Sequence, residues 1–206
     1  MELDGIKFEI SYRKVKYARV ELKTGGLFLI LPPGNDPKVL LEKHKDWIIK
    51  KKKFFDECKR NSADKRIPNR TEAEFKELVL SLISRFSQEL GVTVNKVSFK
   101  NFKRKWGICI PKRKNITFNH TLRYLPDRLL EYIVFHEIAH ILERKHNYRF
   151  WNLIAGKFND YREFDKELIS YQFKIDSSKP LRNSNKGCHC EEAPRPSLRA
   201  PSPGSV

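Results

Sequence analysis

Apolar and polar positions alternate in the first part of the chain, and longer helical periods follow. The alternation predicts strands at residues 6–13 and 16–22, and a short apolar run predicts a third strand at 27–31. Gly25 and Gly26 predict the turn into the third strand. Asp36 followed by Pro37 is a typical helix start, so we expect a helix from there to about Cys58.

A second series of elements begins after a polar connector at residues 59–70. Apolar side chains recur with helical spacing from Thr71 to Leu90, where Thr71 and Glu74 match a capping box and Gly91 predicts the helix end. Short strands are expected at residues 92–99, 105–110 and 116–119, and helices at 126–144, 148–158 and after Asp160. Strands and helices in separate groups indicate the α+β class.

The composition changes after about Asp176. The 206 residues are enough for one domain with a sizeable core, but the last part is rich in Ser and Pro and poor in large apolar residues. We therefore expect one domain over residues 1–175 and a disordered tail over 176–206. The run Cys188-His189-Cys190 in this tail lacks the spacing of a closed tetrahedral metal site.

The formal net charge of +17 indicates attraction to polyanions. Basic clusters at residues 50–53, 100–105 and 112–114 make nucleic acid a candidate partner through a basic surface. The sequence has neither a signal peptide nor an apolar run long enough to span a membrane, and its four cysteines are scattered. We therefore expect a cytoplasmic protein with reduced thiols. The sequence does not indicate an oligomeric state.

The most apolar helical segment, LLEYIVFHEIAHIL at residues 129–142, contains His136, Glu137 and His140. An unpaired polar side chain in such a buried helix costs on the order of 1–3 kcal/mol. Two histidines four residues apart lie on one helix face, so both imidazoles can reach one metal ion. Glu137 follows the first histidine, where its carboxylate can reach a metal-bound water. This is the HExxH pattern of zinc proteases.

A catalytic zinc takes three protein ligands, so a third ligand is needed besides the two histidines of the helix. His146 lies ten residues after the first histidine, and a straight helix would carry it away from the metal. We therefore expect the chain to turn after about residue 144, with Asn147 as a cap for the next helix. The alternative third ligand is a carboxylate farther along the chain, Glu163 or Glu167.

The region around this pattern resembles the core of the YgjP-like metallopeptidases, which are related to the SprT-like and WLM zinc proteases. The motifs that carry the resemblance are Trp106-Gly107-Ile108-Cys109, the strand from Asn115 to Asn119, the helix with HExxH, and His146 followed by Phe150-Trp151. The resemblance covers about residues 6–172. One departure is the pair Ile108 and Ile110, where members of the family often have serines.

The resemblance implies a zincin-like core with an N-terminal small β-sheet and helices, and a zinc-dependent peptidase that acts on peptides or proteins. It implies that zinc is bound by His136, His140 and His146, with Glu137 as the catalytic acid/base. The sequence does not identify the second hydrogen-bond donor that would stabilise the oxyanion formed during hydrolysis. The candidates for this donor are Tyr148, Arg149 and His120. Two alternatives also stay open. One is a nucleic-acid-associated zinc protein, with Cys109 as the fourth ligand if its zinc is structural, and the other is hydrolysis of a non-peptide amide.

Overall fold

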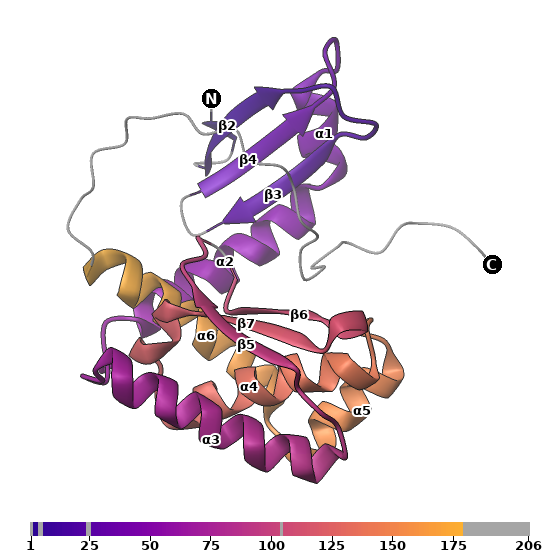
Figure 1. Ribbon diagram of the computed structural model, residues 1–206. Helices are drawn as coiled ribbons and strands as arrows, with labels where there is room; N and C mark the ends of the chain where they lie inside the picture. Colours follow the sequence, from indigo (N-terminus) through magenta and orange to yellow (C-terminus); the bar gives the residue numbers. More distant parts are fainter. Residues whose placement is uncertain (1, 4–5, 24–25, 104, 179–206) are drawn as a thin grey trace. The chain divides into compact units, whose positions relative to one another are not determined.

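The computed structural model describes residues 2–3, 6–23, 26–103 and 105–178 (Figure 1). The chain forms two compact units, one with the residues up to Glu57 and the other comprising Cys58–Asp176. The expected single domain over residues 1–175 stays a prediction. The last helix continues to Ser178, and the rest of the expected tail, including Cys188-His189-Cys190, lies outside the described residues.

The first unit contains a small sheet and two helices (Figure 1). Its strands, in the order of the sheet, are β1 (Glu2–Leu3), β2 (Ile6–Tyr12), β4 (Gly26–Leu31) and β3 (Arg19–Lys23). β2 and β4 are parallel, and the other pairs are antiparallel. Apolar side chains of β4 pack with those of the helices to form a small core of Leu27, Leu29, Leu31, Leu40, Leu41 and Ile48. The three predicted strands of this region are confirmed, whereas Gly25 lies outside the described residues.

The single helix expected from Asp36 to about Cys58 is instead two helices, α1 (Pro37–Lys43) and α2 (Lys45–Asn61). The predicted start is confirmed, because the Asp36 side chain accepts a hydrogen bond of 2.8 Å from the Lys38 backbone N–H. The break occurs at His44, whose backbone N–H donates to the Leu41 carbonyl three residues back, at 3.1 Å. Such a bond tightens the last turn of a helix. The apolar period continues across the break, so the sequence pattern does not reveal it.

The second unit packs helices against a three-stranded sheet (Figure 1). The sheet order is β5 (Lys96–Lys100), β7 (Asn115–Asn119), β6 (Gly107–Ile110), with β5 parallel and β6 antiparallel to β7. The helices are α3 (Glu72–Leu90), α4 (Asp127–Leu142), α5 (Tyr148–Lys157) and α6 (Tyr161–Ser178), with short 3-10 helices η1 (Pro111–Arg113) and η2 (His120–Tyr124). These elements confirm the predicted α+β class.

Helix α3 begins and ends where the sequence predicts. Thr71 Oγ1 accepts a hydrogen bond from the Glu74 N–H at 3.2 Å, and Glu74 Oε2 accepts one from the Thr71 N–H at 2.8 Å. These two bonds form the predicted capping box. Gly91 ends the helix in the left-handed conformation, at φ +61°, which glycine adopts without a steric penalty.

Helix α4 is buried on nearly every face, because it packs against β6, α3 and α5. Its Phe135 ring meets the ring of Phe86 on α3 edge to face, with centroids 5.3 Å apart. Side chains in a densely packed core keep fixed rotamers, so polar groups on α4 are held in defined positions. Among the described residues, no helix has both the length and the apolar character needed to cross a bilayer.

Candidate active site

The structure brings together the three histidines that were predicted as metal ligands. His136 and His140 lie one turn apart on α4, and His146 lies on the connection between α4 and α5. One ligand atom from each ring lies within 4.8 Å of the others. Nε2 of His136 and Nε2 of His146 are only 3.0 Å apart. Within the described part of the chain, no other three or more His, Cys, Asp and Glu side chains meet in this way.

The ring nitrogens have distinct environments. Nδ1 of His140 lies 3.0 Å from the Glu143 carbonyl oxygen and donates to it as N–H, which leaves Nε2 as the lone-pair nitrogen. Nδ1 of His136 is buried and has no hydrogen-bond partner among the described residues. Burial lowers the pKa of all three imidazoles, and that of His136 falls well below its ordinary value. The rings are therefore neutral at neutral pH, and neutral imidazole is the form that binds a metal.

Aromatic side chains at the start of α5 fix the orientation of these rings. Phe150 stacks on His140 with centroids 4.6 Å apart. Trp151 stacks on His146 at 5.6 Å and donates its indole N–H to the His146 carbonyl at 3.1 Å. Asn147 caps α5 by accepting a hydrogen bond of 3.1 Å from the Phe150 N–H, which confirms the cap expected from the sequence. The Phe-Trp pair of the family motif thus packs directly against the candidate ligands.

The two carboxylates considered as alternative third ligands do not join the histidines. Glu167 on α6 forms a salt bridge of 2.9 Å with Lys65 and another with Arg128. Glu163 is exposed on the first turn of the same helix. The geometry therefore favours His146 over both.

Glu137 is buried beside the histidine group and under strand β6. A Cβ atom at Gly107 would lie 2.8 Å from Cγ of Glu137, so only glycine leaves room for this carboxylate. The Cys109 backbone N–H donates to the carboxylate. Burial raises the pKa of Glu137 to about 8, while the nearby Lys105 ammonium and the Cys109 N–H oppose the rise in pKa.

Cys109 does not complete a closed metal site with the three histidines. Burial, with a smaller effect of the Glu137 charge, raises the pKa of the Cys109 thiol to about 12. The absence of Cys109 from the histidine group argues against the structural zinc site that the sequence left open.

Replacing Gly107 by Ala is expected to displace the Glu137 carboxylate, because the added methyl carbon would overlap it. With Glu137 as the acid/base that the resemblance implies, hydrolysis should fall by at least about tenfold, since a catalytic group misplaced by about 1 Å can lose about 10²-fold. The metal content should stay unchanged, because the three atoms nearest to the added carbon all belong to Glu137, which is not one of the three grouped histidines. Steady-state kinetics together with metal analysis would check this, and an unchanged kcat would show that the contact does not matter.

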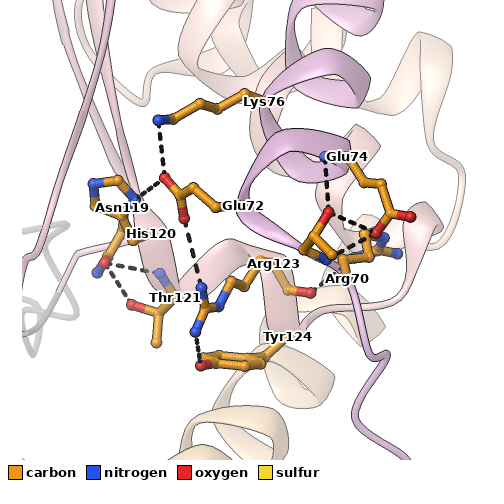
Figure 2. Close-up of polar contacts among 10 residues, drawn as sticks. Arg70, Glu72, Glu74, Lys76, Asn119, His120, Thr121, Arg123 and Tyr124 are labelled. Atoms are coloured by element: carbon orange, nitrogen blue, oxygen red, sulfur yellow. Dashed lines mark hydrogen bonds and ion pairs between the residues drawn. The ribbon is translucent and has the colours of Figure 1, made fainter.

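The candidates for a second oxyanion donor lie in different places. Figure 2 shows His120 of η2 opposite Glu72, the first residue of α3, with His120 Nδ1 2.7 Å from Glu72 Oε1. Lys76 and Arg123 also pair with Glu72. His120 is therefore part of a polar network that joins η2 to α3. Tyr148 and Arg149 are exposed on the first turn of α5, two and three residues after His146, and both stay candidates.

Sequence reasoning missed the role of Asn119, a buried residue at the end of β7. Its side-chain N–H₂ donates to the carbonyls of Phe102 and Lys105, at 2.8 and 2.7 Å. Its Oδ1 accepts a hydrogen bond of 3.1 Å from the Thr121 N–H (Figure 2). Asn119 thereby fixes the loop that leads into Gly107. The Asn-x-Thr spacing indicates the local bond to Thr121, but no local pattern reveals the two bonds to the loop.

A family model for the YgjP-like metallopeptidase domain matches residues 57–171, which include β5 to β7 and helices α3 to α5. The chain belongs to the YgjP-like metallopeptidase family. The resemblance drawn from the sequence is thereby confirmed. Membership identifies the protein as a peptidase, implies peptide or protein substrates, and implies a metal ion.

Two solved structures are similar to this YgjP-like chain, and both are described as metallopeptidase zymogens. Abylysin from Pyrococcus abyssi has 22% identity and a TM-score of 0.42, covering 45% of this chain and 92% of its own. Jannalysin from Methanocaldococcus jannaschii has 22% identity and a TM-score of 0.41, covering 44% and 93%. No curated protein is similar enough to the chain to count as a match.

Proposed function

We propose that this YgjP-like metallopeptidase is zinc-dependent, with His136, His140 and His146 as the zinc ligands. The observation that carries the proposal is the convergence of one ligand atom from each of the three rings within 4.8 Å. Three neutral imidazoles are a typical ligand set for a catalytic zinc, which keeps a fourth position for water or substrate. A bound cation would also satisfy the His136 and His146 Nε2 atoms, which face each other at 3.0 Å.

Zinc, when bound, supplies a Lewis acid that polarises the scissile carbonyl and lowers the pKa of water toward about 7. Glu137 acts as the general base that takes the proton of the attacking water, and then as the acid that delivers it to the departing amine. Its pKa of about 8 falls when a cation binds nearby, because an opposite charge favours the carboxylate. The Cys109 N–H orients the carboxylate for both transfers.

The substrate peptide is proposed to lie along β6. Among the described residues, β6 pairs with β7 on one side and with no strand on the other. A strand with a free edge can pair with an extended peptide through main-chain hydrogen bonds. Because Gly107 of β6 contacts Glu137, a peptide bound there would bring its scissile bond next to the general base.

We also propose a cytoplasmic location. The Cys109 thiol is free, which agrees with a compartment where disulfides are rare.

The test uses the full chain, stripped with a chelator and then reloaded with zinc. We expect about one zinc per chain, as a three-ligand site requires. Cleavage of a diverse peptide library, detected by mass spectrometry, should disappear in the stripped protein and return with zinc. A His136→Ala variant serves as the control for cleavage by contaminants. Cleavage that survives metal removal, or a reloaded protein that holds no zinc, would overturn the proposal.

A further inference from the structure

The sheet of the second unit is built from a segment without acidic residues. Residues 90–126 contain no Asp or Glu, whereas the whole chain contains 25. The same segment contains nine Lys and Arg residues, and it includes β5, β6 and β7. This segment is therefore strongly positive in sequence, although in the fold Arg123 pairs with Glu72 and Lys105 lies near Glu137.

Two groups of these cations flank the strand at the candidate active site. Lys103 and Lys105 precede β6, whose Gly107 contacts Glu137. Lys112 and Arg113 follow β6 in η1, which lies against α4. Positive charges thus stand at both ends of the strand that borders the general base.

The flanking cations differ from those helix cations that have acidic partners. Several helical cations are paired, as in Arg85–Glu131 and Lys157–Glu89, at 3.0 and 2.8 Å. Lys103, Lys112 and Arg113 are exposed, and none forms a salt bridge with a described residue. Exposed charges of one sign create a positive potential over the surface and attract an anionic partner.

We propose that the active-site strand β6 selects acidic peptide segments, in which carboxylates on both sides of the scissile bond meet Lys103 and Lys105 at one end and Lys112 and Arg113 at the other. This inference rests on the proposed function and names its substrate class. The four residues of β6 span about 13 Å at the rise of an extended strand. A peptide paired with β6 would therefore place side chains two or three positions from the scissile bond near the two groups of cations.

The same charges could serve a nucleic acid, but the surface favours a peptide. Proteins that bind single-stranded nucleic acid combine cations with aromatic side chains on which bases stack. Among the described residues of the segment 90–126, the only large apolar side chain that is exposed is Ile110, which is not aromatic. The free edge of β6 instead offers main-chain groups that match an extended peptide.

The experiment measures the binding of three fluorescent peptides to the zinc-loaded full chain by anisotropy. The peptides share one central sequence and carry Glu, Gln or Lys residues on both flanks. At low salt we expect the Glu-flanked peptide to bind about tenfold more tightly than the Gln-flanked one, and the Lys-flanked peptide to bind most weakly. High salt should reduce the preference, because it screens exposed charges.

A triple variant with Lys103→Gln, Lys112→Gln and Arg113→Gln should bind the Glu- and Gln-flanked peptides within about twofold of each other. The matched control carries Lys43→Gln, Lys50→Gln and Lys53→Gln, which removes three exposed lysines of the first unit and changes the net charge equally. This control should keep the preference of the unmodified protein. Loss of the preference in both variants would overturn the assignment to the β6 flanks.

Two further outcomes would overturn the inference. One is equal binding of the Glu- and Gln-flanked peptides by the unmodified protein. The other is that the unmodified protein binds an oligonucleotide more tightly than the Glu-flanked peptide, and that the triple variant loses this oligonucleotide binding. Such a result would show that the cations bind nucleic acid. Anisotropy measures binding and does not require cleavage, so failure of this inference would appear as a missing preference for the Glu-flanked peptide. Failure of the proposed function would instead appear as absent zinc or as absent hydrolysis of every peptide.

Discussion

Replacing Glu137 by Gln should remove nearly all peptide hydrolysis and leave both zinc and fold in place. A Gln amide cannot accept the proton of the attacking water, and general acid–base catalysis contributes about 10²–10⁴-fold to the rate. The side chain has almost the same volume, so it still fits beneath Gly107. Its oxygen can still accept the hydrogen bond that the Cys109 N–H donates to the native carboxylate. Because Glu137 is not proposed as a ligand, the three histidines should keep their zinc.

The matched control is Glu131→Gln on the same helix, where the native side chain is half-exposed and pairs with Arg85 at 3.0 Å. A surface pair of this kind contributes at most about 1 kcal/mol, so this variant should keep both activity and zinc. Kinetics, zinc content and melting temperature should be measured for both variants. Full activity in Glu137→Gln would refute the acid/base role. Loss of zinc or of melting temperature together with activity would instead make Glu137 a structural residue.

The sequence was most informative where short-range geometry determines the structure. The four-residue spacing of His136 and His140 places both on one face of any α-helix, so their approach follows from the pattern alone. Caps are also local, because the Thr71 and Asn147 side chains bond to backbone groups only three residues away. For these features, the residue types and their spacing predict the contact.

Contacts between distant segments could not be predicted in this way. The packing of Gly107 against Glu137 depends on the docking of β6 on α4, thirty residues farther along the chain. The bonds from Asn119 to Phe102 and Lys105 depend on the pairing of β7 with its neighbours in the sheet. No periodic pattern in the sequence shows which residues of these distant segments meet.

Among the described residues, the difference between paired and unpaired cations around β6 could be identified only from the structure. The sequence shows where the basic clusters lie, but it does not show which cations find acidic partners. Glu167 illustrates this point, because it pairs with Lys65, which lies 102 residues earlier, and with Arg128. Only after such pairs are identified do the exposed cations at the two ends of β6 stand out from the overall charge of +17.

Replacing His146 by Ala should strongly reduce both zinc occupancy and hydrolysis. It removes one of three ligand nitrogens, and the two histidines left on α4 form an incomplete set for a catalytic zinc. Loss of a hydrogen-bond partner behind a ligand already weakens metal binding about 10–100-fold, so loss of a ligand should cost more. The Trp151 ring would also lose one stacking partner while keeping Tyr161. Zinc titration in competition with a chelator, together with kinetics, measures these effects.

Glu163→Ala and Glu167→Ala are the decisive comparisons, because these residues were the alternative third ligands. Glu163→Ala should change neither zinc binding nor stability, since the side chain is exposed. Glu167→Ala leaves Lys65 and Arg128 without their partner, so it should lower the melting temperature while zinc affinity stays unchanged. The opposite pattern, with zinc retained in His146→Ala and lost in either Glu variant, would show that α6 supplies the ligand. The 3.0 Å approach of His146 Nε2 to His136 Nε2 would then be a hydrogen bond between two histidines.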